Sequence, residues 1–182
     1  KLPPGQLVLA TAYPAGRAAD PAVAVPLAGA VAAGELRWTP PPGRWQVVAM
    51  TNDRVYDGTH AAMNVYRHQP YTNLLQPEPT ARFLEMTHDA YARELGQDLG
   101  ATFRATFTDE PSLMTAFFSP MPYAVLPWAP GFPAEFARRR GYALEPELAA
   151  LAVADTPRAR QVRYDFWLTV SEQVRASFTL PI

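Results

Sequence analysis

The alternation of apolar and polar residues predicts β-strands in the first quarter of the chain. The strand-like runs are Leu7–Tyr13, Glu35–Thr39 and Trp45–Thr51. The last two flank the turn-forming Pro40–Gly43, so we expect them to pair as a β-hairpin. Trp38 and Trp45 would then pack across that hairpin. Core packing is the simpler role for this pair, and stacking on a sugar is the alternative.

From about residue 70 onward the apolar period becomes mainly that of helices. A short strand is predicted at Tyr71–Leu75, followed by a helix over Pro77–Leu95 with Pro77 at its first position and Gly96 as its C-terminal cap. The apolar stripe of this helix is Phe83, Met86, Thr87, Ala90, Tyr91 and Leu95.

Three further helices are predicted over Pro133–Arg140, Pro146–Val153 and Pro157–Phe178. Gly141 would end the first of them after a run of three arginines. Asp155 or Thr156 would cap the last one. Its buried face would consist of Val162, Phe166, Val170 and Val174, with Trp167 beside it.

Between the first helix and the later ones, Phe103–Glu110 reads as a buried strand that stops at Pro111. The order strand, helix, strand, helices is typical of parallel α/β architecture. We therefore expect an α/β fold: a β-rich segment over residues 1–70, and a partial (β/α)8 barrel segment of the TIM type over residues 71–182. In such a barrel Glu110 and Arg104 would face the axis, and Glu110 would emerge at the mouth.

Glu110 is the candidate general acid, because a carboxyl in a partly desolvated mouth has a raised pKa. Its neighbour Asp109 would point to the other side and bind surrounding loops or an arginine. The alternative for both carboxylates is that they cap a loop. Tyr123 and Trp128, with Phe117 and Phe118, lie in a long aromatic loop that would either stack on sugar rings or form a small core.

The composition excludes several classes of function. The 182 residues carry a formal charge of −1, so nothing indicates a nucleic-acid or membrane-surface partner. There is no cysteine, which excludes disulfides and thiolate sites. The three histidines lack metal-ligand spacing, although the loop residue His60 would reach the barrel mouth if it is not simply solvated. One lysine against 15 arginines indicates a GC-rich, bacterial type of genome.

No membrane span or signal peptide is visible, and the compartment stays open, with an extracytoplasmic location slightly favoured. Both ends look cut, so we expect a fragment of a larger protein.

Several motifs together resemble glycoside hydrolase family 106, the α-L-rhamnosidase-like enzymes and related large glycosidase-like proteins. The resemblance covers roughly residues 35 to 178. The matching pieces are Leu36-x-Trp38 with Pro42-x-Arg44-Trp45, Gly58-Thr59-His60, Asn73–Glu78, Phe83–Tyr91, Phe107–Pro111, Pro127–Phe132, Arg140–Tyr142 and Val162–Trp167.

This resemblance implies inverting hydrolysis of α-L-rhamnosides or related glycosides of plant or microbial glycans, with Glu110 at the catalytic mouth and Ca²⁺ as a possible cofactor. The substrate-binding candidates are Asp109, His60, Asn73, Trp128 and Tyr123, and no residue is assigned to a metal. Gln76 stands where the family pattern leads us to expect Asp.

A full barrel needs about 250 residues, so we expect the second catalytic carboxylate to be missing and the chain alone to be incomplete. The alternatives are a non-catalytic carbohydrate-binding protein and a decayed barrel fragment without activity.

Overall fold

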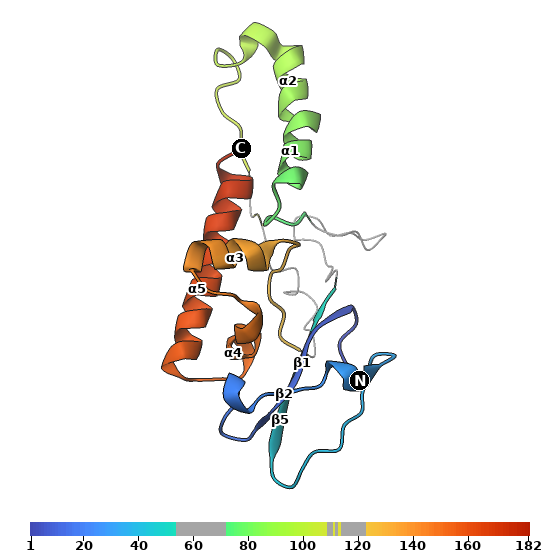
Figure 1. Ribbon diagram of the computed structural model, residues 1–182. Helices are drawn as coiled ribbons and strands as arrows, with labels where there is room; N and C mark the ends of the chain where they lie inside the picture. Colours follow the sequence, from blue (N-terminus) through green and yellow to red (C-terminus); the bar gives the residue numbers. More distant parts are fainter. Residues whose placement is uncertain (54–71, 109–110, 112, 114–122) are drawn as a thin grey trace. The chain divides into compact units, whose positions relative to one another are not determined.

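The computed structural model describes residues 1–53, 72–108, 111, 113 and 123–182 (Figure 1). The chain divides into two compact units. The first unit comprises Lys1–Val55 and Met121–Thr169, and the second comprises Tyr56–Pro120 and Val170–Ile182.

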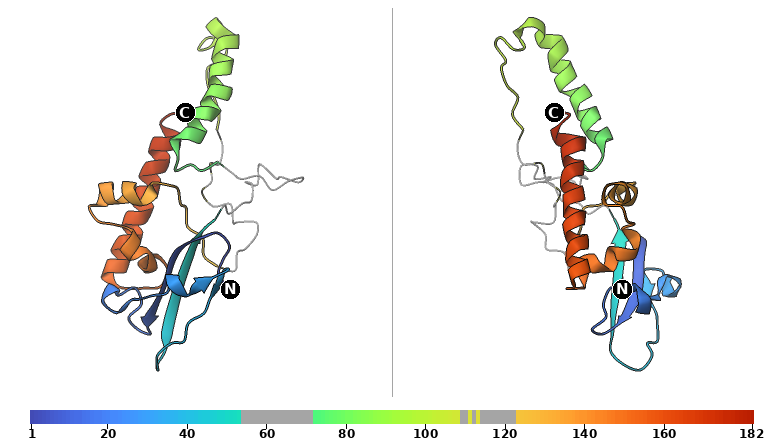
Figure 2. Two further views of the ribbon diagram at one scale, coloured as in Figure 1. Left: turned by 45° about the vertical axis from the view of Figure 1, so that its right-hand side comes forward. Right: turned by 60° about the vertical axis from the view of Figure 1, so that its left-hand side comes forward.

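The first unit contains a three-stranded antiparallel sheet in the order β2-β1-β5 (Figure 2). Its strands are β1 (Gln6–Pro14), β2 (Val25–Pro26) and β5 (Trp45–Asn52). The short β3 (Val31–Ala32) and β4 (Glu35–Leu36) form a separate antiparallel pair, and the 3₁₀ helices η1 (Pro21–Val23) and η2 (Ala28–Ala30) connect the strands. Pro26 lies in an edge strand, where its missing N–H costs no central ladder bond.

Gly5 begins the tight approach of β1 to β5. Its φ is +104°, and a Cβ at this position would lie 2.4 Å from the carbonyl oxygen of Asn52. Only glycine satisfies both the conformation and the space.

The expected hairpin between residues 35–39 and 45–51 is wrong, since β4 pairs with β3 and β5 pairs with β1. Three successive prolines, at 40–42, offer no backbone N–H, so a ladder cannot close against them. The packing of Trp38 on Trp45 is nevertheless confirmed. The rings meet edge to face with centroids 5.4 Å apart, beside the buried cluster of Ala10, Ala12 and Leu27.

The helices of the first unit follow the sequence pattern closely. They are α3 (Phe132–Arg140), the 3₁₀ helix η6 (Glu145–Glu147), α4 (Leu148–Ala152) and α5 (Pro157–Val174), which continues into the second unit. Gly141 ends α3 in the left-handed conformation at φ +79°. At the start of α5, Thr156 Oγ1 accepts a bond of 3.1 Å from the backbone N–H of Ala159, as expected of an N-cap.

Aromatic rings fill the space between α3 and α5. Phe132, Phe136 and Phe166 are fully buried, and the rings of Phe132 and Phe166 meet with centroids 5.3 Å apart. Val162, Phe166 and Val170 form the buried face of α5, as its period predicts.

The second unit contains α1 (Pro77–Met86), α2 (His88–Leu95), the 3₁₀ helix η4 (Gly96–Asp98), the end of α5 and a π-helical turn, η7 (Arg175–Thr179). Helix α1 contacts η7, and Gln173 Nε2 donates a bond of 2.9 Å to the carbonyl of Leu75. The single helix expected over residues 77–95 is broken at Thr87, whose Oγ1 donates to the Phe83 carbonyl at 2.6 Å. Competition of this kind from a threonine hydroxyl bends or ends helices.

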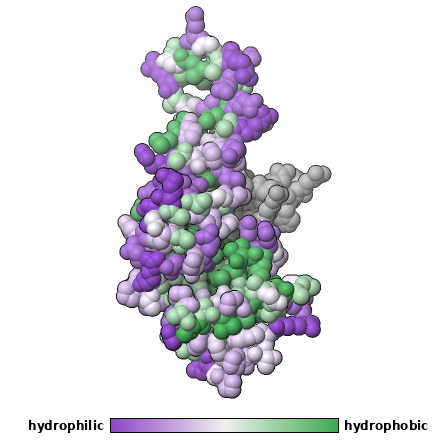
Figure 3. Space-filling model, viewed as in Figure 1, coloured by the Kyte–Doolittle hydropathy of each residue, from purple (hydrophilic) through white to green (hydrophobic). Residues whose placement is uncertain are grey.

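The apolar stripe of the broken helix α1–α2 is largely exposed. Phe83, Met86 and Tyr91 all lie at the surface, and Figure 3 shows apolar residues among the charged ones on these two helices. The sequence period is helical, but the described residues of the second unit leave much of the stripe uncovered.

The predicted (β/α)8 barrel segment is wrong. The described residues form an antiparallel three-stranded sheet, a two-stranded pair and helices, and they contain no closed sheet. The expected strand over Phe103–Glu110 is also absent from its described part, 103–108, where Phe103 makes one isolated bridge to Leu99. Likewise, residues 72–75 form a turn instead of the expected strand. Short apolar runs do not specify a pairing partner, which explains both errors.

Candidate functional site

Three of the expected site residues, Glu110, Asp109 and His60, lie outside the described residues. The other three are described, but they belong to different units: Asn73 to the second, Tyr123 and Trp128 to the first.

Asn73 shapes the turn that precedes α1. Its Oδ1 accepts a bond of 3.1 Å from the backbone N–H of Leu75, and its carbonyl accepts from the N–H of Gln76 at 3.1 Å. This is an Asx turn, which sets the direction of chain entry into the helix. Gln76 then occupies the N-cap position without a side-chain cap bond, as expected where Asp is replaced.

Trp128 extends the aromatic core of the first unit. Its ring is tilted by 50° to that of Phe132, with centroids 5.8 Å apart, and the side chain is half-buried. Tyr123 is half-buried in the same segment. For Trp128 the geometry favours the small-core alternative, because Phe132 contacts its ring and belongs to the fully buried core.

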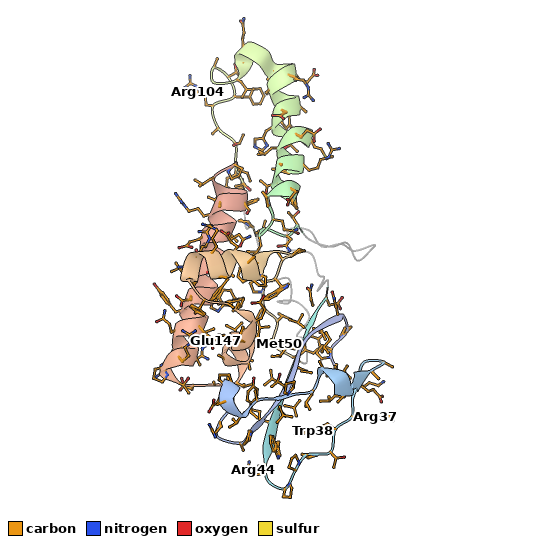
Figure 4. All side chains as sticks on the ribbon, viewed as in Figure 1. Arg37, Trp38, Arg44, Met50, Arg104 and Glu147 are labelled. Atoms are coloured by element: carbon orange, nitrogen blue, oxygen red, sulfur yellow. The ribbon has the colours of Figure 1, made fainter. Side chains whose placement is uncertain are left out.

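Arg104 does not face a barrel axis. It is exposed on the loop after η4 (Figure 4), and its Nε donates to the carbonyl of Ala101 at 3.1 Å. His88 lies at the first position of α2, as placed by the sequence on a helix. Its Nδ1 lies 2.9 Å from Thr87 Oγ1, and its ring packs edge to face on Phe83.

A cavity of about 370 Å³ in the first unit was missed by the sequence analysis. It lies between the loop that follows β1 and the ends of α4 and α5 that face this loop. Small residues supply much of its wall, and its polar groups are Arg17, Asp20, Glu147, Thr156 and Arg158. Figure 4 places Glu147 near the start of α4.

Two ion pairs line this cavity. Arg17 Nη2 lies 2.5 Å from Asp20 Oδ2, and Arg158 Nη2 lies 2.6 Å from Glu147 Oε1. The bond from Arg17, aided by the backbone N–H of Ala22, lowers the pKa of the Asp20 carboxyl. Asp20 is therefore ionised at neutral pH and cannot serve as a proton donor.

The cavity loop also holds a strained residue. Ala19 has φ +61°, in the left-handed region that disfavours residues with a Cβ. Its position is fixed by the turn that the Arg17–Asp20 pair closes, in which the Asp20 N–H donates to the Arg17 carbonyl at 3.2 Å.

Behind the cavity, Arg158 joins a second polar cluster. Its guanidinium lies 4.2 Å from the centroid of the Tyr142 ring, and the Tyr142 hydroxyl donates to Asp165 Oδ2 at 2.8 Å. Burial, followed by the bond to Asp165, raises the pKa of Tyr142 well above its usual value. The phenol therefore stays protonated and acts as a fixed hydrogen-bond donor.

The lining of the cavity offers hydrogen-bond donors and acceptors to a polar ligand. Paired carboxylates and guanidiniums at a rim can exchange hydrogen bonds with hydroxyl groups. Only the Asp-Pro step at residues 20–21, typical of a turn or helix start, signals this loop in the sequence. Glu147 and Arg158 belong to segments that lie far from this loop in the sequence, and no local pattern indicates that they line the cavity.

The described residues do not fit a metal centre, since no group of three or more His, Asp or Glu side chains among them could hold an ion. A Ca²⁺ site therefore has no support there. No helix in the same part of the chain is long and apolar enough to cross a membrane.

Comparison with family models, with curated proteins and with solved structures gives no match to this chain.

Proposed function

We propose that this chain is part of a glycoside hydrolase that acts on α-L-rhamnosides or related glycosides, with Glu110 as the general acid. The observation that carries the proposal is the ordered set of motifs between residues 35 and 178, which includes Asp109-Glu110-Pro111.

In the first unit, the described residues of the motifs serve mainly to pack the fold. Trp128, Phe132 and Phe166 stack in sequence, and Tyr142 donates to Asp165. These contacts explain why such residue types occur in the three later motifs. Asp165 is thus used inside the fold, whereas the family resemblance assigns the proton transfer to Glu110.

In the proposed reaction, the Glu110 carboxyl gives its proton to the glycosidic oxygen as the bond from that oxygen to the anomeric carbon breaks. A water molecule attacks the anomeric carbon from the opposite face and loses its proton to a second carboxylate. In inverting enzymes the two carboxyl groups lie about 6.5–9.5 Å apart. The products are the free sugar and the leaving-group alcohol. We assign no residue to the second carboxylate.

The test compares Glu110→Gln with the wild type, both in the full-length protein, on two rhamnosides, one with a poor alkyl leaving group and one with an activated aryl group. Loss of general acid catalysis should slow the first substrate about 10²- to 10⁴-fold. The second should be affected much less, because its leaving group needs no proton. Glu145→Gln, at an exposed carboxylate at the start of η6, is the matched control and should change neither rate.

Two results would contradict the proposal. If Glu110→Gln cleaves the poor substrate as fast as the wild type, Glu110 is not the acid. If the full-length wild-type protein cleaves neither substrate, the proposed hydrolysis of α-L-rhamnosides is wrong.

A non-catalytic carbohydrate-binding protein is the second candidate, and the 370 Å³ cavity favours it. Its volume falls within the usual range for small-ligand sites, and its lining carries both donors and acceptors. Calorimetric titration with L-rhamnose, run beside the kinetic assay, separates the two. Saturable binding without turnover would support this candidate, and turnover would exclude it.

A further inference from the structure

The segment Phe103–Thr108, which follows η4, has the residue pattern of a β-strand but pairs with no strand of the described part of the chain. Phe103 makes local backbone bonds, donating to the Asp98 carbonyl and accepting from the Gly100 N–H. Residues 105–108 make no backbone hydrogen bond to the other described residues. An extended segment with free N–H and C=O groups is a template for pairing with another strand.

The apolar side chains of this segment also face solvent. Phe103 is 53% exposed and Phe107 is 87% exposed. Burying two phenylalanine rings would contribute far more to the free energy of association than burying isolated small residues. Both the backbone and the side chains of the segment therefore favour an additional partner.

We propose that residues 103–107 pair antiparallel with the same segment of a second copy of this chain, about a two-fold axis through Ala105. In this register Phe103 lies opposite Phe107 of the second copy, and Arg104 lies opposite its Thr106. Ala105 lies opposite its own counterpart.

The segment is self-complementary in this register. Strand periodicity puts Phe103, Ala105 and Phe107 on one face, so the two Phe–Phe pairs flank the small alanine pair. On the other face each arginine meets a threonine, and no like charges are opposed. A two-fold pairing uses the same patch on both copies and closes on itself.

The proposed dimer is weak because each copy contributes only five residues to the ladder. Contacts of this size fall below the area of stable interfaces, so the association should depend on concentration in the micromolar range or above. This inference does not depend on the proposed hydrolase activity.

Single cysteines test the register directly, because the chain has no cysteine of its own. Ala105→Cys would bring two copies of residue 105 together, with Cα atoms about 4.5–5.5 Å apart in an antiparallel ladder. That separation fits a disulfide. In Arg104→Cys or Thr106→Cys the two cysteines would lie roughly 8 Å apart, from the strand spacing and a two-residue offset, which is too far for a bridge.

Under mild oxidation we expect Ala105→Cys to form covalent dimers at least about tenfold faster than either neighbour. Equal rates at all three positions would indicate parallel in-register or random contact and would overturn the proposal. Absence of covalent dimer in Ala105→Cys would overturn it as well.

Sedimentation across a concentration series gives an independent measurement. The wild type should form dimers as its concentration rises, and Phe107→Lys should weaken this association at least about tenfold, because it removes both Phe–Phe pairs. Tyr164→Lys, at a 64% exposed position on α5, is the matched control and should dimerise like the wild type. A wild type that stays monomeric, or that grows into open-ended aggregates, would refute the closed dimer.

Discussion

Replacement of Tyr142 by phenylalanine would remove one hydrogen bond from the interior of the first unit while leaving the ring in place. The hydroxyl donates to Asp165 Oδ2 at 2.8 Å, and Asp165 is only 8% exposed. The phenylalanine ring would keep the edge-to-face contact with Phe136, whose centroid lies 5.0 Å from that of Tyr142. The change therefore reports on the bond and not on the packing.

The expected loss in the free energy of unfolding is about 2 kcal/mol. Hydrogen bonds to charged groups contribute about 1.5–3 kcal/mol. Water does not replace the donor that a buried carboxylate loses. In a chain of this length such a loss lowers the Tm by about 4–8 °C.

Urea denaturation followed by circular dichroism measures this difference. Tyr164→Phe, at an exposed tyrosine on the same helix as Asp165, should change the free energy of unfolding by less than about 0.5 kcal/mol. If Tyr142→Phe costs no more than Tyr164→Phe, the bond to Asp165 does not stabilise the fold and the reasoning is refuted.

The same variant has a pH signature. The pKa of Tyr142 is raised in the folded chain, mainly by burial and then by the bond to Asp165. The unfolded chain releases this proton near pH 10, whereas the folded chain retains it. The stabilising contribution is therefore complete below pH 10 and is lost as the pH rises toward the folded pKa. Above pH 10 the wild type should lose stability faster than Tyr142→Phe.

Two further predictions concern α3 and α5. Phe166→Ala, at a fully buried ring, should lower the free energy of unfolding by about 3–5 kcal/mol, measured by chemical denaturation. Trp167→Ala, at a 43% exposed side chain, should lower it clearly less. Equal losses would show that Phe166 does not belong to the core. Hydrogen bonds from Arg138 and Arg139 lower the pKa of Glu135 to about 2, so its contribution is present above its usual pKa near 4.5 and is lost as the pH falls through about 2. Glu135→Gln should therefore be less stable than the wild type at pH 7, by about 1 kcal/mol after screening at this partly exposed site, and the difference should vanish near pH 2; a difference that does not change with pH would contradict the ion-pair explanation.

The sequence predicted those elements whose boundaries are set by local chemistry. Helix α3 ends at Gly141, and α5 begins after the hydroxyl cap of Thr156. The signals for both lie within one helical turn of the boundary. The buried face of α5 was predicted correctly for Val162, Phe166 and Val170, because a helical period assigns one face whatever the partner, whereas Val174 is only partly buried.

The pairing of strands and the exposure of faces depend on distant segments, and here the sequence misled. A proline-rich turn indicated a hairpin, yet β5 pairs with β1, some 35 residues earlier in the chain. The pattern of α1 and α2 is helical, but a helical period does not indicate whether Met86 or Tyr91 will be covered. The barrel was inferred from the order of elements, which does not determine whether strands pair in parallel.

The candidate site divides in the same way. Asn73 was selected by its motif, and in the structure its side chain stabilises the turn before α1 by accepting a hydrogen bond from the Leu75 N–H. The cavity around Glu147 and Arg158 depends on a contact between residues 11 positions apart, across a helix junction. No local pattern distinguishes that pair from two solvated charges.

Arg163 binds the carbonyl oxygens of Ala150 and Ala154 with the same nitrogen, at 2.8 and 2.6 Å. One guanidinium on α5 thus satisfies acceptors within α4 and in the connection that follows it. Fraying of α4 would break bonds made by α5, so the two helices should open as one cooperative segment. A lysine at this position would present a single point charge without the rigid fork of donors, and the connection would then be free to open before either helix unwinds.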